Sequence, residues 1–191
     1  ALYAGPDYAA KTWQAAGKFT EEGGKGLFTR PETEMKCAGA PLKHTFLIDD
    51  LAKKAGNAGR IEIGYTAPQA SLFGVPIVAE KVRMLFGDRG IAAHTKPTFA
   101  TDDGTVEMEY DYLHVIPPQR APDVIRQSGL SWADKWTDQG WVECDKATLR
   151  HLRYDTIWAL GDVAGVPKGK TAASVKWQVP VVEDGLLAAI E

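Results

Sequence analysis

Helix-like and strand-like segments alternate along the first half of this chain, and this alternation limits the folds that the chain can adopt. Residues 27–29, 60–65 and 91–95 have the composition of strands. Between them, apolar stripes that begin at Pro41 and Pro76 predict two helices, since proline suits the first turn of a helix. A β-α-β-α-β order predicts parallel strands joined by right-handed helical crossovers. We therefore predict an α/β fold with a Rossmann-like, nucleotide-binding-type domain.

The flanking segments predict further parts of the molecule. Residues 1–24 form a connector, with a helix over residues 7–22 that ends at a glycine pair. Residues 25–117 form the nucleotide-binding-type domain. A proline-rich stretch over residues 117–122 indicates a hinge or a domain crossing, so residues 118–191 are expected to belong to another domain.

A β-hairpin is expected to follow the third strand. Residues 99–101 and 106–110 flank the turn-forming run Asp102-Asp103-Gly104, and the acidic side chains here suit the solvated side of a hairpin. A further strand is predicted over residues 112–116. In the second half of the chain, residues 156–160 predict a buried strand.

Composition excludes several classes of protein. The chain has 191 residues, of which 45% are hydrophobic and 25% charged, enough to bury a core in one or two domains. A formal net charge of -3, with no cluster of lysine or arginine, argues against nucleic acid as a partner. No apolar run is long enough for a membrane span, and the start has no charged-then-apolar signal pattern. Two cysteines are too few for a disulfide framework and fit a reducing compartment, although one bridge between them stays open.

Three familiar motifs are not fulfilled. The run from Gly165 to Thr171 resembles a phosphate loop, but three residues separate its glycines where the motif needs four. The sequence G-x-G-x-x-G is absent, which argues against tight NAD binding. The four histidines lack metal-ligand spacing, so no metal site is expected and each histidine is interpreted as structural.

Cys37 lies where the first strand gives way to the first helix, at the place where a nucleotide-binding βαβ unit carries its glycine loop. A sulfur at a helix start faces the positive end of the helix dipole, which favours thiolate over thiol and therefore indicates redox or sulfur chemistry. Periodicity alone leaves an inert, buried thiol equally open. Cys144 sits between charged residues with no helix start beside it, and we assign it a structural role.

Eight short motifs are distributed along most of the chain, between residues 28 and 174. They occupy residues 28–31, 36–43, 71–75, 113–124, 140–142, 145–151, 158–162 and 167–174. The second of them, Lys36-Cys37-Ala38-Gly39-Ala40-Pro41-Leu42-Lys43, contains the cysteine. In their order and spacing these motifs resemble the sulfide:quinone oxidoreductases, in particular the branch that includes the mitochondrial enzyme.

The resemblance implies a two-domain fold like that of glutathione reductase, in which a second nucleotide-type domain, residues 25–117, interrupts an FAD domain. Residues 118–191 would be the segment that returns to the FAD domain. It implies that sulfide is oxidised between two redox cysteines near the flavin and that two electrons pass through FAD to a quinone. Cys37 matches the catalytic cysteine, which can form a persulfide. The cofactor-binding residues that the resemblance implies, from the second flavin motif and from segments near the flavin ring, are Gly161, Asp162, Lys170, Thr171 and Lys43. A cation near the ring would stabilise negative charge on the reduced flavin.

Three parts of the family pattern have no counterpart in this sequence, and we expect the chain to be a fragment. They are the amino-terminal strand with its G-x-G-x-x-G loop, the second redox cysteine, and the amphipathic C-terminal tail that contacts the membrane. Cys144 does not occupy the second cysteine's place. The fragment is expected to be soluble and inactive and to hold FAD weakly or not at all. Its parent is expected at the surface of the bacterial or mitochondrial inner membrane, and homo-oligomer formation stays open.

Two alternatives stay open. The first is a related flavoprotein, a type II NADH:quinone reductase or a flavocytochrome sulfide dehydrogenase, although Cys37 and the missing glycine loop argue against the NADH enzyme. The second is a non-enzymatic module with a nucleotide-type fold, an inert thiol and protein partners.

Overall fold

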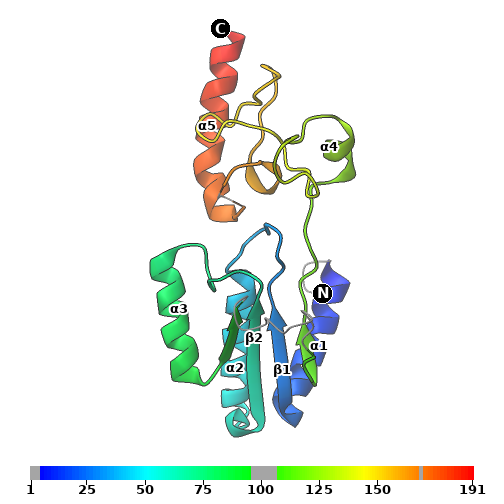
Figure 1. The fold of residues 1–191 in the computed structure, drawn as a ribbon, viewed down its shortest axis with the longest axis vertical. Helices are drawn as coiled ribbons and strands as arrows, with labels where there is room; N and C mark the ends of the chain where they lie inside the picture. Colours follow the sequence, from blue (N-terminus) through cyan, green and yellow to red (C-terminus); the bar gives the residue numbers. More distant parts are fainter. Residues whose placement is uncertain (1–4, 96–106, 168–169) are drawn as a thin grey trace. The chain divides into compact units, whose positions relative to one another are not determined.

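The chain divides into two compact units. The computed structural model describes residues 5–95, 107–167 and 170–191. The first unit comprises Ala1–Glu32 and Gly39–Pro117, and the second comprises Thr33–Ala38 and Pro118–Glu191. Figure 1 colours both units along the chain, from blue at the amino end to red at the carboxyl end. The short segment of residues 33–38 thus leaves the first unit and joins the second.

A four-stranded parallel sheet forms the centre of the first unit. Its strands are β1 (Gly24–Thr29), β2 (Ile61–Ala67), β3 (Ala92–Thr95) and β4 (Tyr112–His114). Their order across the sheet is β3-β2-β1-β4, and Phe28 of β1 lies opposite Tyr65 on one side and His114 on the other. The predicted α/β fold with a Rossmann-like parallel sheet is confirmed.

Each α-helix of this unit has a proline in its first turn. They are α1 (Pro6–Glu22), α2 (Ala40–Lys54) and α3 (Pro76–Arg89), with a short 3₁₀ helix, η2, over Ala58–Arg60. Figure 1 shows these helices alongside the strands. Helix α3 ends at Gly90, whose φ of 70° is the left-handed conformation that glycine adopts most readily.

The core of the first unit is aromatic and aliphatic. Phe28 and Tyr65 from the sheet are fully buried, together with Ile48 of α2 and Phe86 of α3. The rings of Tyr65 and Phe86 pack edge to face, with their centroids 5.5 Å apart. Burying side chains of this size stabilises the fold by roughly 1.5–3 kcal/mol each. The helices are therefore held to the sheet by the apolar stripes that predict them.

The predicted hairpin is not found in its described part. Residues 99–101 and Val106 lie outside the described residues, and residues 107–110 are not in a strand. Instead, the following residue, Asp111, binds the start of β1: its N–H donates to Lys25 O at 2.8 Å, and its carboxylate accepts from Lys25 N at 2.7 Å. The strand expected over residues 112–116 ends at His114.

The second unit contains little regular structure. Its helices are α4 (Asp123–Gln127), the 3₁₀ helix η4 (Gly161–Val163) and α5 (Ala172–Ile190). Between them, segments meet at single β-bridges, such as Cys144 with His151 and Val142 with Ala164. A small apolar cluster that includes Val142, Leu149 and Val182 forms its core.

The buried strand predicted over residues 156–160 is wrong. Trp158 makes one isolated bridge, with Arg150, and the described residues of this segment form no ladder beyond this bridge. Leu149, beside Arg150, has a left-handed φ of 59°, so the segment that pairs with Trp158 departs from an extended conformation. Helix α5 is not among the predicted elements; it buries Val182 and leaves Trp177 exposed.

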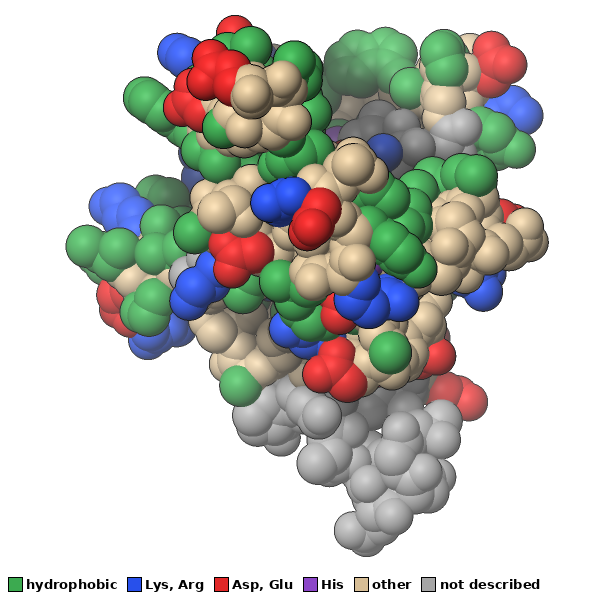
Figure 2. Space-filling model, turned by 90° about the horizontal axis from the view of Figure 1, so that it is seen from above, with side chains coloured by type: hydrophobic (Ala, Val, Ile, Leu, Met, Phe, Trp, Pro, Cys, Tyr) green, Lys and Arg blue, Asp and Glu red, His purple; other side chains and the backbone are tan. Residues whose placement is uncertain are grey.

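Charges of both signs are interspersed on the face shown in Figure 2. Acidic and basic side chains lie between apolar ones, and the described side chains of this face form no extended patch of one sign. This distribution accords with a net charge of -3 spread over many residues of both signs.

Candidate functional site

Cys37 belongs to the second unit, although α2, which begins three residues later at Ala40, belongs to the first. The N-cap of α2 is Gly39, so Cys37 lies two positions ahead of the cap. The side chain is exposed, and the backbone has a φ of 51°, a left-handed conformation that is uncommon for a residue other than glycine. The backbone N–H of Cys37 donates to the carbonyl oxygen of Lys170 at 2.6 Å. This bond joins the cysteine segment to a residue 133 positions later in the chain.

The ammonium group of Lys170 is buried, with 6% of the residue exposed. Its Nζ donates to the carbonyl oxygens of Asp162 at 2.7 Å and Ala164 at 2.8 Å, and it lies 3.9 Å from the centre of the Trp141 ring. Burial lowers the pKa of Lys170 to about 8, against the opposing effect of the acidic groups of Asp162 and Glu34. Burial thus disfavours the charged form of Lys170, and the two backbone carbonyls and the Trp141 ring face its ammonium group.

Gly161 and Asp162 form the short turn that Lys170 supports. Gly161 has a φ of 71°, and its N–H donates to Oε1 of Gln178 at 2.7 Å. The Asp162 side chain is exposed, and among the described residues it has no hydrogen bond or ion pair. Its carboxylate is consequently available as an acceptor for hydroxyl groups of a ligand.

Thr171 begins helix α5. Its Oγ1 accepts a hydrogen bond from the N–H of Ser174 at 3.1 Å, which caps the helix. Lys43 is different, because it is an exposed residue of α2 in the first unit. The structure thus brings five of the six predicted site residues into the second unit, linked through Lys170, and leaves Lys43 in the other.

Cys144 is buried in the core of the second unit. Burial raises the pKa of its thiol, which favours the protonated, unreactive form. Both cysteines are free, so the bridge between Cys37 and Cys144 that the sequence left open is not formed. A buried, protonated thiol fits the structural role predicted for Cys144.

The sequence did not reveal a histidine pair in the first unit. The ring centroids of His44 and His114 lie 4.3 Å apart, and Nε2 of His44 is 2.9 Å from the hydroxyl oxygen of Tyr112. Burial, and secondarily the charge of His44, lowers the pKa of His114 to about 4. Burial also lowers the pKa of His44 and raises that of Tyr112 to about 12. Among the described residues no group of acidic, cysteine and histidine side chains could hold a metal ion.

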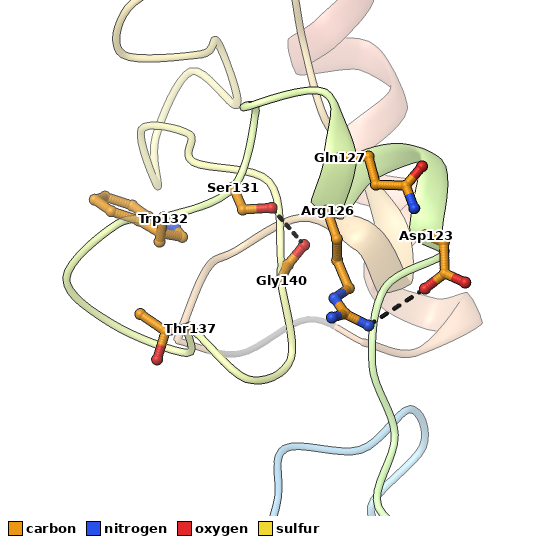
Figure 3. Close-up of a pocket in the computed structure, with 7 residues that line it drawn as sticks. All are labelled: Asp123, Arg126, Gln127, Ser131, Trp132, Thr137 and Gly140. Carbon is orange, nitrogen blue, oxygen red and sulfur yellow. Dashed lines mark hydrogen bonds and ion pairs between the residues drawn. The ribbon is translucent and has the colours of Figure 1, made fainter.

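A polar cavity of about 320 Å³ lies within the second unit. Figure 3 shows α4 on one side, with Asp123, Arg126 and Gln127, and the loop with Ser131, Trp132, Thr137 and Gly140 on the other. Arg126 pairs with Asp123 at 3.2 Å, and the hydroxyl of Ser131 donates to Gly140 O at 3.1 Å. The indole N–H of Trp132 donates to Gly165 O at 2.9 Å. The hydrogen bonds of Ser131 and Trp132 hold the loop of residues 131–140 beside this cavity.

No helix among the described residues combines the length and the apolar character that crossing a bilayer requires.

The first unit defines a Rossmann-like α/β protein, and the second carries an exposed cysteine whose backbone N–H donates to the carbonyl of Lys170. A chain of the cryo-EM structure of the Tetrahymena thermophila mitochondrial ATP synthase, a composite F1Fo tetramer, has a similar fold, with a TM-score of 0.72 at 17% identity. The superposition covers 93% of this chain and 46% of that chain, and the likeness concerns the fold alone. No protein-family model matches the chain.

Curated relatives identify the family to which the motifs point. The mitochondrial sulfide:quinone oxidoreductase of Dictyostelium discoideum is 34% identical over 95% of this chain, and that of Mus musculus is 32% identical over 91%. The enzyme of Schizosaccharomyces pombe is 28% identical over 85% of the chain. The chain is a homologue of the mitochondrial sulfide:quinone oxidoreductases, as its motifs predict. It spans about two fifths of the length of these relatives, with 38% to 42% of each covered.

Proposed function

We propose that this chain contributes an active-site cysteine, Cys37, to a flavoprotein that oxidises sulfide and reduces a quinone. The hydrogen bond between Cys37 N and Lys170 O carries the proposal, because Lys170 also binds the turn with Asp162. It ties the cysteine segment to the residues that the family resemblance assigns to the flavin. The names of the curated relatives support the same substrates, sulfide and quinone.

The proposed reaction balances with a persulfide as the sulfur product. Hydrogen sulfide and the Cys37 thiol together lose two protons and two electrons, and one S–S bond forms between their sulfur atoms. The quinone takes up two protons and two electrons and becomes a quinol. FAD, when bound, supplies the capacity to accept and pass on the electron pair. An exposed thiol suits this role, because sulfide has to reach the sulfur atom.

The residues of the Gly161-Asp162 turn and of the start of α5 fit a flavin. The exposed Asp162 carboxylate can accept hydrogen bonds from the hydroxyl groups of a ribityl chain. Gly161 permits the turn, and the backbone of Lys170 and Thr171 would run along the ring system. Lys170 would place its positive charge near the ring while its Nζ supports the carbonyl of Asp162. For Lys43, on α2 of the first unit, a role toward the cofactor rests on the family resemblance alone.

The partners follow from the substrates. Quinones with long apolar tails are dissolved in membranes, so we propose that the whole protein acts at a membrane surface, and the relatives' names suggest that this membrane is mitochondrial. Homo-oligomer formation is compatible with this arrangement.

Replacing the cysteine tests the proposal. In the whole protein that carries this chain, Cys37→Ser should abolish reduction of a short-chain quinone by sulfide, because serine cannot form a persulfide. Cys144→Ala is the matched control and should retain turnover, since that thiol is buried and protonated. Turnover by the Cys37→Ser protein at the unchanged rate would contradict the catalytic assignment.

A further inference from the structure

Two glutamines form hydrogen bonds between residues 33–38 and the rest of the second unit. Gln119 makes two contacts with this segment: its Oε1 accepts from the backbone N–H of Lys36 at 2.9 Å, and its own N–H donates to Thr33 Oγ1 at 3.3 Å. The Lys36 bond lies one residue before Cys37. Gln119 therefore anchors the segment on the amino side of the cysteine.

Gln139 binds the same segment through its side-chain amide. Its side chain is buried, with 7% of the residue exposed, and its Nε2 donates to Glu34 O at 3.0 Å and to Gln119 O at 3.3 Å. The backbone carbonyl of Gln139 accepts a hydrogen bond from the backbone N–H of Ala121 at 2.7 Å. One buried amide thus connects the cysteine segment with the stretch that contains Gln119. Both of its N–H groups are used, so removal of the amide would leave two carbonyl oxygens without a partner.

The loop around Gln139 is shaped to hold this side chain in place. The backbone N–H groups of Gln139 and Gly140 both donate to Trp136 O, at 3.0 and 2.9 Å. Gly140 has a φ of 67°, and a Cβ there would lie 2.3 Å from Cγ of Arg126. Figure 3 shows Arg126 and Gly140 on facing sides of the cavity. Glycine at this position lets the Arg126 side chain pack on the loop and keeps the turn closed.

We propose that Gln119 and Gln139 are positioning residues for Cys37, an inference that rests on the proposed function of this cysteine. They hold residues 33–38 so that the Cys37 N–H stays bonded to Lys170 O while the backbone keeps its left-handed conformation. A left-handed non-glycine residue persists only when its surroundings fix it. The hydrogen bonds of the two glutamines and the carbonyl of Lys170 are these surroundings.

The two glutamines have opposite hydrogen-bonding roles toward the segment, which allows a matched test. Gln119 accepts with its side-chain oxygen, whereas Gln139 donates with its side-chain nitrogen. Glutamate has the shape of glutamine but, when ionised, can only accept. Gln119→Glu should therefore preserve the anchor, Gln119→Leu should remove it, and Gln139→Glu should remove it and place a carboxylate against two carbonyl oxygens. Gln14→Glu, on the exposed face of α1, controls for the change of charge.

Hydrogen exchange of the Cys37 amide in this chain provides the first measurement. Gln139→Glu and Gln119→Leu should each accelerate exchange at Cys37 roughly tenfold, since each loses one or more hydrogen bonds that fix the segment. Gln119→Glu and Gln14→Glu should leave the rate within about twofold of the original. Unchanged exchange in both Gln139→Glu and Gln119→Leu would overturn the proposal, as would equal acceleration by Gln119→Glu and Gln119→Leu. If Gln139→Glu does not fold, the two variants at the half-buried Gln119, Gln119→Glu and Gln119→Leu, test the proposal.

Steady-state kinetics of the whole protein separates positioning from general structure. Gln139→Glu should lower kcat for sulfide oxidation roughly tenfold, in line with the loss of order at the cysteine, while the flavin content per chain and KM for the quinone stay unchanged. A loss of flavin in parallel with activity would overturn the positioning role. Turnover by Cys37→Ser would instead disprove the proposed function, and the exchange rates at Cys37 would still show whether the glutamines hold the segment.

Discussion

The two units keep their residues in place by different means. In the first unit, strand ladders fix the backbone, and large apolar side chains such as Phe28 and Phe86 hold the helices to the sheet. In the second unit, segments meet at isolated bridges, and buried polar side chains bind backbone carbonyls: Lys170 binds two, and Gln139 binds two. The candidate site lies in the unit with less regular structure. The difference teaches that polar side chains in this second unit take over the role that strand pairing has in the first.

The largest expected effect is on the apolar core of the first unit. Phe28→Ala should lower the free energy of unfolding of this unit by about 3–5 kcal/mol, because it leaves a cavity among fully buried side chains. Hydrogen exchange of the β1 and β2 amides during urea unfolding measures this change. Leu47→Ala, at a half-exposed position of α2, is the control and should cost less than about 1 kcal/mol. An equal decrease in the free energy of unfolding for the two variants would contradict the view that the apolar core holds the first unit together.

Acid should destabilise the first unit through its histidine pair. The pKa of His114 is lowered from 6.5 to about 4, so between these pH values the unfolded chain binds more protons than the folded unit. The stability present above pH 6.5 is then lost as the pH falls toward 4, by about 3 kcal/mol in all. His44, whose pKa burial also lowers, acts in the same direction. His114→Asn should flatten this part of the stability profile, and an unchanged slope would contradict the assignment.

Alkali should stabilise the second unit through Lys170. Its pKa is lowered from 10.5 to about 8, so the folded unit gives up the proton at a lower pH than the unfolded chain does. Between pH 8 and 10.5 the free energy of unfolding should rise with pH, by at most about 3 kcal/mol. Tryptophan fluorescence can follow this, since of the six tryptophans only Trp13 lies in the first unit.

The rise should disappear in Lys170→Met and persist in Lys176→Met, an exposed position of α5. A rise that survives Lys170→Met would show that another group of the second unit titrates in this range. Stability would thus rise with pH in both units but in different ranges, between pH 4 and 6.5 for the first unit and between pH 8 and 10.5 for the second.

The smallest effect compares two glycines with nearly equal backbone conformations. Gly90 in the first unit has a φ of 70°, and Gly140 in the second has a φ of 67°. An added Cβ at Gly90 meets nothing within 4 Å, whereas at Gly140 it lies 2.3 Å from Cγ of Arg126. Gly90→Ala should cost about 1 kcal/mol from the left-handed backbone alone. Gly140→Ala should cost about 1–2 kcal/mol more.

Thermal unfolding of the two variants measures the difference, and adding Arg126→Ala to Gly140→Ala should remove the extra cost. If the double variant is no more stable than Gly140→Ala, contact with Arg126 is not what limits this position.

The sequence was informative where structure depends on local patterns. Strands and helices of the first unit follow from apolar periodicity and from prolines such as Pro41 and Pro76, because each pattern acts over a few neighbouring residues. The strand predicted over residues 156–160 failed because an apolar run does not show whether a partner strand lies beside it. The family resemblance named five site residues that the structure places in one unit.

The contacts that hold Cys37 could not be predicted in this way. Gln139 reaches Glu34 across 105 positions, and such a bond leaves no periodic trace in the sequence. The burial of Lys170 was equally hidden, because the composition around it does not show that Trp141 covers its ammonium group. The pairing of His44 with His114 depends on α2 and β4 lying side by side in three dimensions.

The return of residues 33–38 to the second unit has a consequence for the order in which the molecule is completed during synthesis. A ribosome makes Cys37 long before Lys170, its hydrogen-bond partner 133 residues later. At roughly 5–20 residues per second, the thiol waits about 7 to 27 seconds for that partner. The sheet can form during this interval, but the segment with Cys37 gains its bond to Lys170 only after residue 170 has been made. Cys37 is thus made before Gln119, Gln139 and Lys170, and the contacts that hold its segment can form only after these residues have been made.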